Sequence, residues 1–392
     1  MKTIPLNEQD ILDIMQGATM LASGGGGSFR DGVDLLNVYK RKYPDAEISV
    51  HLVSPNEIEE TSNGAVVAVM GAPTGSLAQP DLSGCVTSAF DELCEIAKRD
   101  NRKIDYMFPI EMGGFNTFVP MLISLVTGRA ILDADACGRA VPGLGTVLAA
   151  KNGCDTAPVA MADVNDNRVS LIPTDKKDVA IIEKMTLPVV QLFEQNAGIA
   201  GWILSRQEIT DLIPNGTITK SLHIGRMISE LKAQKGNRQY IGDVFENLNK
   251  IEKITAKALH HSPQKIENYF SRQIDGWDVG EFFIGGSKLN PRLHVMFTNE
   301  SLLVKQQEAD QSWKTIITAP DIISFYDART GNPLTNVDLE IASINNMLDE
   351  LEIVLGLIKV DDKWNINSDA VNSAWNPYFE RLGYAGPCIP YQ

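Results

Sequence analysis

The first half of the chain alternates short apolar runs with amphipathic stretches, and this pattern limits the possible folds more than any other feature. Runs rich in Val, Ile and Phe are typical of strands, and apolar residues spaced three and four apart are typical of helices. Strands that alternate with helices build a parallel sheet covered on both faces. The pattern therefore predicts a three-layer α/β/α domain with a mostly parallel sheet. Its strands are predicted at residues 48–53, 65–70, 104–108 and 130–132, with helices at residues 86–98 and 117–127.

The later part of the chain has a different pattern of apolar and turn-forming residues. Residues 158–162 and 168–172 indicate a hairpin around a polar turn, and helical patterns dominate from there to about residue 247. From about residue 254, short β-type runs are split by Gly, Asn, Pro and Asp, which favours a small antiparallel barrel or sandwich. A chain of 392 residues exceeds what one core usually supports. We predict an α/β domain over residues 1–247 that carries the site, and a β-rich domain over residues 248–392.

The charge balance excludes some classes of partner. A net charge of −15 and an isoelectric point of about 4.8 make a surface that repels nucleic acid and anionic membranes. The chain has no apolar run long enough to span a membrane and no signal-peptide pattern at its start. Its five cysteines are scattered without zinc-site spacing. We expect a cytoplasmic protein with reduced thiols that binds a small molecule and neither nucleic acid nor membrane.

Four consecutive glycines, at residues 24–27, lie between two helical patterns. The first helix is predicted to begin after Asn7, which can cap it, and the second covers residues 33–39. Glycines let backbone amides approach a ligand, and a helix N-terminus favours a bound negative charge. The alternative is a flexible turn that binds nothing. The predicted substrate-binding residues here are Gly25, Gly26, Gly27 and Ser28.

Two more loops with glycines follow predicted strands directly. In open α/β sheets ligands bind at the carboxyl ends of the strands, where such loops lie. A buried carboxylate there needs a partner, a cation or a catalytic duty. Glu111 is therefore a candidate catalytic residue, and the alternative is a carboxylate that only satisfies a helix terminus. The predicted substrate-binding residues of the two loops are Gly71, Pro73, Gly114 and Asn116.

An acidic loop follows the last predicted strand, at the same edge of the sheet. Asp133 and Asp135, two residues apart, can bind a divalent cation or divide into acid and base roles. Arg139 can bind an anionic substrate, although a local salt bridge with one aspartate is the alternative. Asp163 can join the group after the next strand. We predict catalytic roles for Asp133, Asp135 and Arg139, and a divalent metal ion at the two aspartates is the cofactor that the sequence allows.

Nucleophilic catalysis has less support. Ser28 and Cys137 are candidate nucleophiles, but each needs a base, and none of the five histidines lies in these loops. His260 and His261 can bind a metal, although an exposed, solvated pair is the simpler interpretation.

Together these loops resemble the S-methyl thiohydantoin desulfurase family. The resemblance is looser in the middle of the chain but spans most of it. One position departs from the pattern, because relatives usually carry an acidic residue where this chain has Gly143. The segments that carry the resemblance are residues 24–27, 70–73, 111–116, 133–142, 216–225, 297–300, 320–323 and 327–334.

The resemblance implies an α/β domain followed by a β-rich domain, and kinship with hydantoinase- and oxoprolinase-type enzymes that act on cyclic amides. It implies a hydrolase or desulfurase in which water attacks the thioether-bearing ring carbon and methanethiol leaves. Glu111, Asp133 and Asp135 are then expected around that carbon, with Arg139 and Asn116 orienting the ring. The alternative is a non-catalytic ligand-binding subunit that partners a hydantoinase-type enzyme, and the sequence also allows a homo-oligomer.

Overall fold

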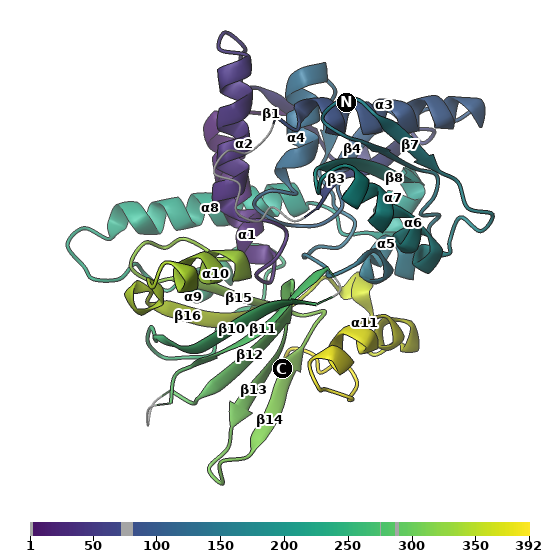
Figure 1. Ribbon diagram of the computed structural model, residues 1–392. Coiled ribbons are helices and arrows are strands. Elements are labelled where there is room, and N and C mark those ends of the chain that lie inside the picture. The colour runs from purple at the N-terminus through teal and green to yellow at the C-terminus, as the bar shows by residue number, and fades with distance from the viewer. Residues whose placement is uncertain (1–2, 72–80, 275, 287–289) are drawn as a thin grey trace.

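The N-terminal part of the protein is built on one eight-stranded sheet (Figure 1). The computed structural model describes residues 3–71, 81–274, 276–286 and 290–392. In spatial order the strands are β1 (Thr3–Leu6), β2 (Val50–Val53), β5 (Ile131–Leu132), β4 (Tyr106–Pro109), β3 (Asn63–Met70), β8 (Ala197–Ser205), β6 (Val159–Ala162) and β7 (Arg168–Leu171).

The four strands predicted from the alternating pattern lie together and pair in parallel, from β2 through β5 and β4 to β3. β1 and β8 add antiparallel neighbours at either side of this group. β6 points the same way as β3, because two antiparallel pairings separate them, and β7 completes the predicted hairpin. The sheet is mixed but mostly parallel, as predicted.

Helices cover both faces of this sheet. Alternate residues of each strand point to opposite sides, so Ala65 and Val67 pack into one core cluster while Val66 and Ala68 pack into another. The three-layer prediction is confirmed. One face is covered by α1 (Glu8–Leu21), α2 (Phe29–Lys42), α3 (Ser83–Arg99) and α4 (Phe118–Thr127). The other is covered by α5 (Leu148–Lys151), α6 (Val179–Leu192) and α7 (Arg206–Leu212). Three more helices extend these two clusters: α8 (Thr217–Gln234) packs on α1, α9 (Val244–Leu248) packs on α8 and on the β-rich part, and α11 (Asp369–Arg381) packs beside α5.

The β-rich part is a sandwich of two antiparallel sheets. Their inner faces share one apolar core, in which the Phe282 and Phe325 rings meet edge to face at 5.7 Å between centroids. This confirms the predicted barrel or sandwich. The larger sheet contains β10 (Ile266–Ile274), β11 (Trp277–Ile284), β12 (Leu293–Thr298), β13 (Glu300–Gln307) and β14 (Trp313–Thr318). The smaller contains β15 (Ile322–Asp327), β16 (Ile353–Ile358) and β9 (Ala256–Ala258), and α10 (Asn336–Ile344) lies beside the sandwich.

Strand β8 was not predicted, because the residues after the hairpin, up to about 247, were predicted to be mostly helical. β8 contains Gly198 and Gly201, which weaken its strand pattern. Gly198 is required by packing, since a Cβ there would lie 2.5 Å from the backbone oxygen of Cys85 in α3. The C-terminal helix α11 was also missed, although its aromatic residues join a core cluster of the first domain.

The two parts of the chain share a buried junction. α1 and α8 pack side by side between the large sheet and the sandwich (Figure 1), and residues of β15 and β16 join their core cluster. Among the described residues, no helix combines the length and apolar character needed to cross a membrane. The division into domains at residue 247 stays a prediction.

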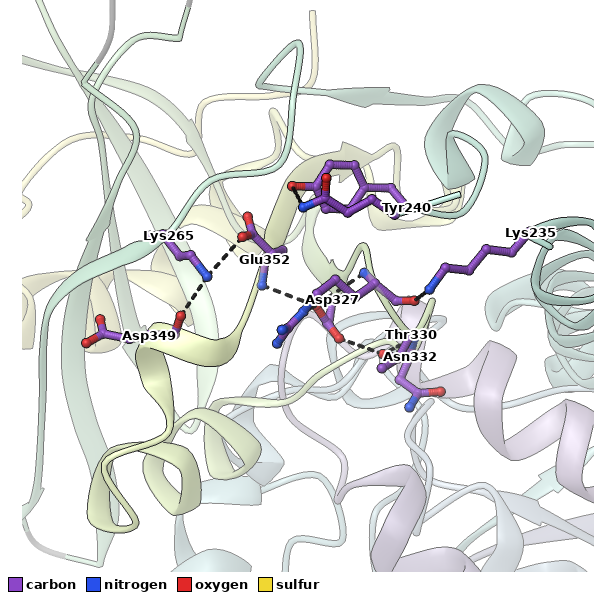
Figure 2. Close-up of polar contacts among 10 residues, drawn as sticks. Lys235, Tyr240, Lys265, Asp327, Thr330, Asn332, Asp349 and Glu352 are labelled. Carbon is purple, nitrogen blue, oxygen red and sulfur yellow. Dashed lines mark hydrogen bonds and ion pairs between the residues drawn. The ribbon is translucent and has the colours of Figure 1, made fainter. Parts of the chain in front are cut away.

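Part of this junction is held by the turn over residues 327–334, shown in Figure 2. The buried Asp327 carboxylate accepts hydrogen bonds from the Thr330 hydroxyl at 2.8 Å and from the Glu352 N–H at 3.1 Å. Lys235, at the end of α8, donates to the Arg329 carbonyl at 2.5 Å. Glu352 also pairs with Lys265 at 2.9 Å. One of the family-like segments is therefore a structural clamp between α8 and the sandwich.

Candidate active site

Three of the predicted site loops, the glycine loop and the loops after β4 and β5, meet where the carboxyl ends of these strands face the sandwich. The glycine loop between α1 and α2 and the loop after β4 touch backbone to backbone. Gly114 N–H donates to the Gly27 carbonyl at 3.0 Å, and Asn116 N–H donates to the Gly26 carbonyl at 3.1 Å. Gly26 and Gly27 have positive φ angles of 67° and 74°, which favour glycine. The loop is held in place, so its glycines serve close packing rather than a free turn.

The same glycine loop also contacts the sandwich, at the turn between β12 and β13. Ser301 N–H donates to the Ser23 carbonyl at 2.7 Å, and the Ser23 hydroxyl donates back to the Ser301 carbonyl at 2.9 Å. A Cβ at Gly25 would collide with the Glu300 carboxylate. Glu300 is only 3% exposed. No role for Glu300 was predicted from the sequence. Its position as a lone carboxylate between two apolar strands could have indicated one.

Replacing Gly25 by Ala tests this contact. Its φ is not in the left-handed region, so the added methyl acts only through its collision with Glu300. We expect a loss of stability of about 1–3 kcal/mol from overpacking, measured by urea unfolding. Gly84→Ala in α3 is the matched control, because nothing lies within 4 Å of a Cβ there, and it should be neutral or stabilising. Equal stability of the two variants would contradict the contact.

Glu111 lies buried between the two loops. One oxygen accepts a 2.7 Å hydrogen bond from the Asn116 side chain, and the other accepts a 2.8 Å bond from the Val141 N–H. Burial raises the Glu111 pKa to about 7, and the nearby Asp135 charge adds to the rise while Arg139 opposes it. A carboxyl group with a pKa near neutrality is suited to general acid–base catalysis.

Arg139 is fully buried and reaches from the first domain into the second. Its Nη1 donates to the carbonyls of Pro320 and Asp321 at 2.6 and 2.9 Å, its Nε donates to Ala140 at 2.7 Å, and its guanidinium lies 5.0 Å from the Trp375 ring centroid. Burial lowers its pKa to about 10, and the Glu300 carboxyl is the first of the acidic groups that oppose this.

Asp135 is buried beside this group and shapes the loop that carries Arg139. One of its oxygens accepts hydrogen bonds from the N–H groups of Cys137 at 3.0 Å and Gly138 at 2.5 Å. Burial raises the Asp135 pKa to about 7, although these bonds oppose the rise. Burial also raises the Cys137 pKa well above its usual range, which disfavours a thiolate nucleophile. A catalytic role for Asp135 stays a prediction.

Asp133 points to a different neighbour, the N-terminus of α8. Its carboxylate accepts hydrogen bonds from the Thr219 N–H at 3.0 Å and the Thr219 hydroxyl at 2.5 Å. Gly216 precedes the helix and has no side chain to cap it, so Asp133 provides the cap from a distant part of the chain. This is the function of an N-cap residue.

Replacing Asp133 by Ala should therefore lower stability rather than turnover. We expect a loss of about 0.5–2 kcal/mol, measured by chemical unfolding, with kcat per folded molecule close to the wild-type value. Asp133→Asn keeps an acceptor oxygen and should recover most of the lost stability. A large fall in kcat with unchanged stability would show instead that Asp133 takes part in the chemistry.

The donor set around the two aspartates does not fit a metal ion. Three of the four carboxylate oxygens already accept backbone or hydroxyl hydrogen bonds, two on Asp133 and one on Asp135. Within the described residues there is no group of three or more His, Cys, Asp or Glu side chains placed to hold a metal. We derive no step through a metal ion.

Other residues that were predicted for the site make contacts that stabilise the fold. Ser28 caps α2, where its hydroxyl donates to Asp31 at 2.8 Å and accepts from the Asp31 N–H at 3.0 Å. Gly71 packs against the Gln195 carbonyl, and Pro73 lies outside the described residues. Asp163 organises the β6–β7 turn by accepting hydrogen bonds from the Asn165 and Asn167 N–H groups at 2.9 and 2.8 Å.

The prediction of an exposed histidine pair is wrong for His260, which is buried.

The space beside Gly143 is occupied by groups from two helices. A Cβ at this position would lie 2.7 Å from the Glu183 carboxylate of α6 and would collide with the Tyr378 hydroxyl of α11. Glu183 accepts a 3.3 Å hydrogen bond from the Leu144 N–H, and burial raises its pKa. The chain thus places a carboxylate next to Gly143 from elsewhere in the sequence.

Several buried polar atoms in this region have no hydrogen-bond partner among the described residues. They include Asn116 Oδ1, Asp135 Oδ1, Arg139 Nη2 and Glu300 Oε2. Buried polar groups are normally paired, since an unpaired one costs about 1–3 kcal/mol. An acceptor, a donor and a carboxyl left unpaired around Glu111 indicate a place for a polar ligand.

Comparison with known families agrees with an architecture of two parts. A model described as the S-Me-THD-like N-terminal domain matches residues 9–172, and the S-Me-THD-like C-terminal domain matches residues 176–343. The chain belongs to the S-Me-THD-like family. This is the family of the S-methyl thiohydantoin desulfurases, and the matched residues include Glu111, Asp135, Arg139 and Glu300.

A solved structure has a fold similar to that of this chain. A crystal structure of a protein from Chromobacterium violaceum is similar to this chain with a TM-score of 0.81, over 99% of this chain and 100% of that one. The two sequences are 23% identical, so the likeness concerns the fold. A search of curated proteins gave no match.

Proposed function

We propose that this member of the S-Me-THD-like family hydrolyses S-methyl thiohydantoins to hydantoins and methanethiol. The observation that carries the proposal is the buried cluster of Glu111, Arg139 and Asn116, with the unpaired atoms described above. The ring of a thiohydantoin offers a carbonyl oxygen and an N–H group. Arg139 Nη2 is free to donate to the carbonyl, and Asn116 Oδ1 is free to accept from the N–H.

Glu111 is the general base in this proposal. It accepts a proton from water as the water oxygen bonds to the ring carbon that carries sulfur. The C–S bond then breaks, the ring carbon becomes a carbonyl, and the two protons of water end on the ring nitrogen and on methanethiol. A base with a pKa of about 7 is half ionised near neutral pH. Enough of it is then ionised to accept a proton, and it is still basic enough to take that proton readily. Asn116 and the Val141 N–H hold the two oxygens of Glu111 in place.

The experiment uses the purified chain alone. It is incubated with an S-methyl thiohydantoin in water labelled with heavy oxygen, and methanethiol and the labelled hydantoin are measured together. The proposal predicts one labelled carbonyl for each methanethiol released. Tight binding of the thiohydantoin without release of methanethiol would contradict hydrolysis and favour a ligand-binding subunit that needs a hydantoinase-type partner.

A control variant addresses the position where relatives carry an acidic residue. If the Glu183 carboxylate takes over that role beside Gly143, Glu183→Gln should lower turnover at least about 10²-fold, the lower end for a proton-transfer group. Unchanged turnover in Glu183→Gln would show that the reaction in this chain does not need a carboxylate at this place.

A further inference from the structure

Glu300 is held rigidly in the turn between β12 and β13. Asn299, immediately before it, has a positive φ of 56°, and its side chain and N–H form hydrogen bonds of 2.9 and 2.8 Å with the backbone of Asp278. Ser301, immediately after it, is bonded to Ser23 as described above. Both neighbours of Glu300 are therefore fixed, and the side chain is directed at the glycine loop of the first domain.

The surroundings of the Glu300 carboxyl do not explain it as a structural residue. One oxygen packs against Gly25, and Oε2 has no hydrogen-bond partner among the described residues. A buried structural carboxylate normally accepts two or three hydrogen bonds or forms an ion pair. No salt bridge of Glu300 occurs within the described part of the chain, even though Arg139 is close enough to affect its pKa.

The positions of Arg139 and Glu111 place this carboxyl at the proposed reaction site. Arg139 bonds to the carbonyls of Pro320 and Asp321, and the adjoining Ala319 pairs with Leu302, two residues after Glu300. Glu111 lies in the loop that packs against Gly26, one residue from Gly25. Burial, followed by the Glu111 charge, raises the Glu300 pKa well above its ordinary value.

We propose that Glu300 is the general acid that protonates sulfur as methanethiol leaves, so that the second domain supplies a catalytic group to the site. This inference rests on the proposed function. Glu111 takes a proton from the attacking water and passes it to the ring nitrogen. As the tetrahedral intermediate collapses, its hydroxyl proton goes to Glu111 and the Glu300 proton goes to sulfur. Transfer of the proton from Glu111 to Glu300 then restores both groups.

The test compares two leaving groups. An alkanethiol is a weak acid, like the cysteine thiol, so its departure is helped by an acid, whereas 4-nitrothiophenol leaves readily as its anion. We expect Glu300→Gln to lower kcat for the S-methyl substrate by at least about 10²-fold, and for the S-(4-nitrophenyl) substrate by less than about 3-fold. Glu111→Gln should slow both substrates alike, because both need the base.

Equal losses for the two substrates in Glu300→Gln would overturn the proposal and leave Glu300 a packing role. If Glu300→Gln fails to fold, Glu300→Asp replaces it, since its shorter carboxyl should show the same selective loss. If the wild-type chain hydrolyses neither substrate, the proposed function fails on its own. Infrared spectroscopy then still tests the protonation of Glu300. A protonated-carboxyl band that the wild type shows at neutral pH and Glu300→Gln lacks would support the general acid. The absence of this band from the wild type would overturn the proposal.

Discussion

Replacing Glu111 by Gln lowers kcat for S-methyl thiohydantoin hydrolysis by about 10²- to 10⁴-fold, the usual contribution of a general base. Gln keeps the size of the side chain and one acceptor oxygen, so the contacts with Asn116 and Val141 are partly retained. Methanethiol release under saturating substrate measures the loss. Glu208→Gln is the matched control, because Gln preserves the capping box that Glu208 forms at the start of α7, and its kcat should equal that of the wild type.

The pH dependence gives the same prediction an independent readout. The pKa of Glu111 is raised from 4.5 to about 7, so the base is protonated at low pH and kcat/KM should rise as the pH increases through about 7. Folding stability should change in the opposite direction. A raised carboxyl pKa favours the folded protein while the carboxyl is protonated, and this advantage is lost between pH 4.5 and about 7. Glu111→Gln should flatten the kcat/KM profile, and an unchanged kcat/KM profile would contradict its role as the base. It should remove only its own part of the stability change, because the pKa of Asp135 is also raised to about 7.

Replacing Arg139 by Ala destabilises the protein by about 3–5 kcal/mol, the range for breaking a buried charge arrangement. The substitution removes the three hydrogen bonds to carbonyls and the contact with Trp375, and it leaves the Glu300 carboxyl without its nearby positive charge. Urea unfolding followed by tryptophan fluorescence measures the loss.

The control for Arg139 is an arginine with a surface salt bridge. Arg168 pairs with Asp166 at 2.9 Å, but both side chains are exposed, and Arg168→Ala should change stability by less than about 1 kcal/mol. Arg139→Lys should remain strongly destabilised, because an ammonium group cannot reproduce the flat, forked arrangement of donors. Near wild-type stability of Arg139→Ala would contradict the view that this residue joins the two domains.

The sequence predicted many strands and helices of the first domain but gave no order for the strands in the sheet. The parallel group β2 to β5 and the helices α3 and α4 follow from local periodicity, since apolar spacing directly reports which face is buried. β8 was missed because its two glycines are explained only by neighbours distant in the chain, α3 for Gly198 and residues 156–159 for Gly201. A contact between residues far apart in the chain leaves no local pattern.

The same limit applies to the site. Glu111, Asn116 and Arg139 were predicted together because strand ends of one sheet gather at one edge, and the structure places them in one buried cluster. Asp133 has the same local pattern but caps a helix 86 residues later. Glu300 reaches the cluster through the packing of the sandwich onto the glycine loop, which the spacing of residues does not report.

The most direct test of the site is a crystal structure of Glu111→Gln with an S-methyl thiohydantoin bound. The account predicts the ring between Asn116 Oδ1 and Arg139 Nη2, with its sulfur facing Glu300. A cavity of about 140 Å³ elsewhere, lined by Arg99 and Lys176, offers the contrary result. A ring bound there, with the cluster around Glu111 unchanged, would contradict the account.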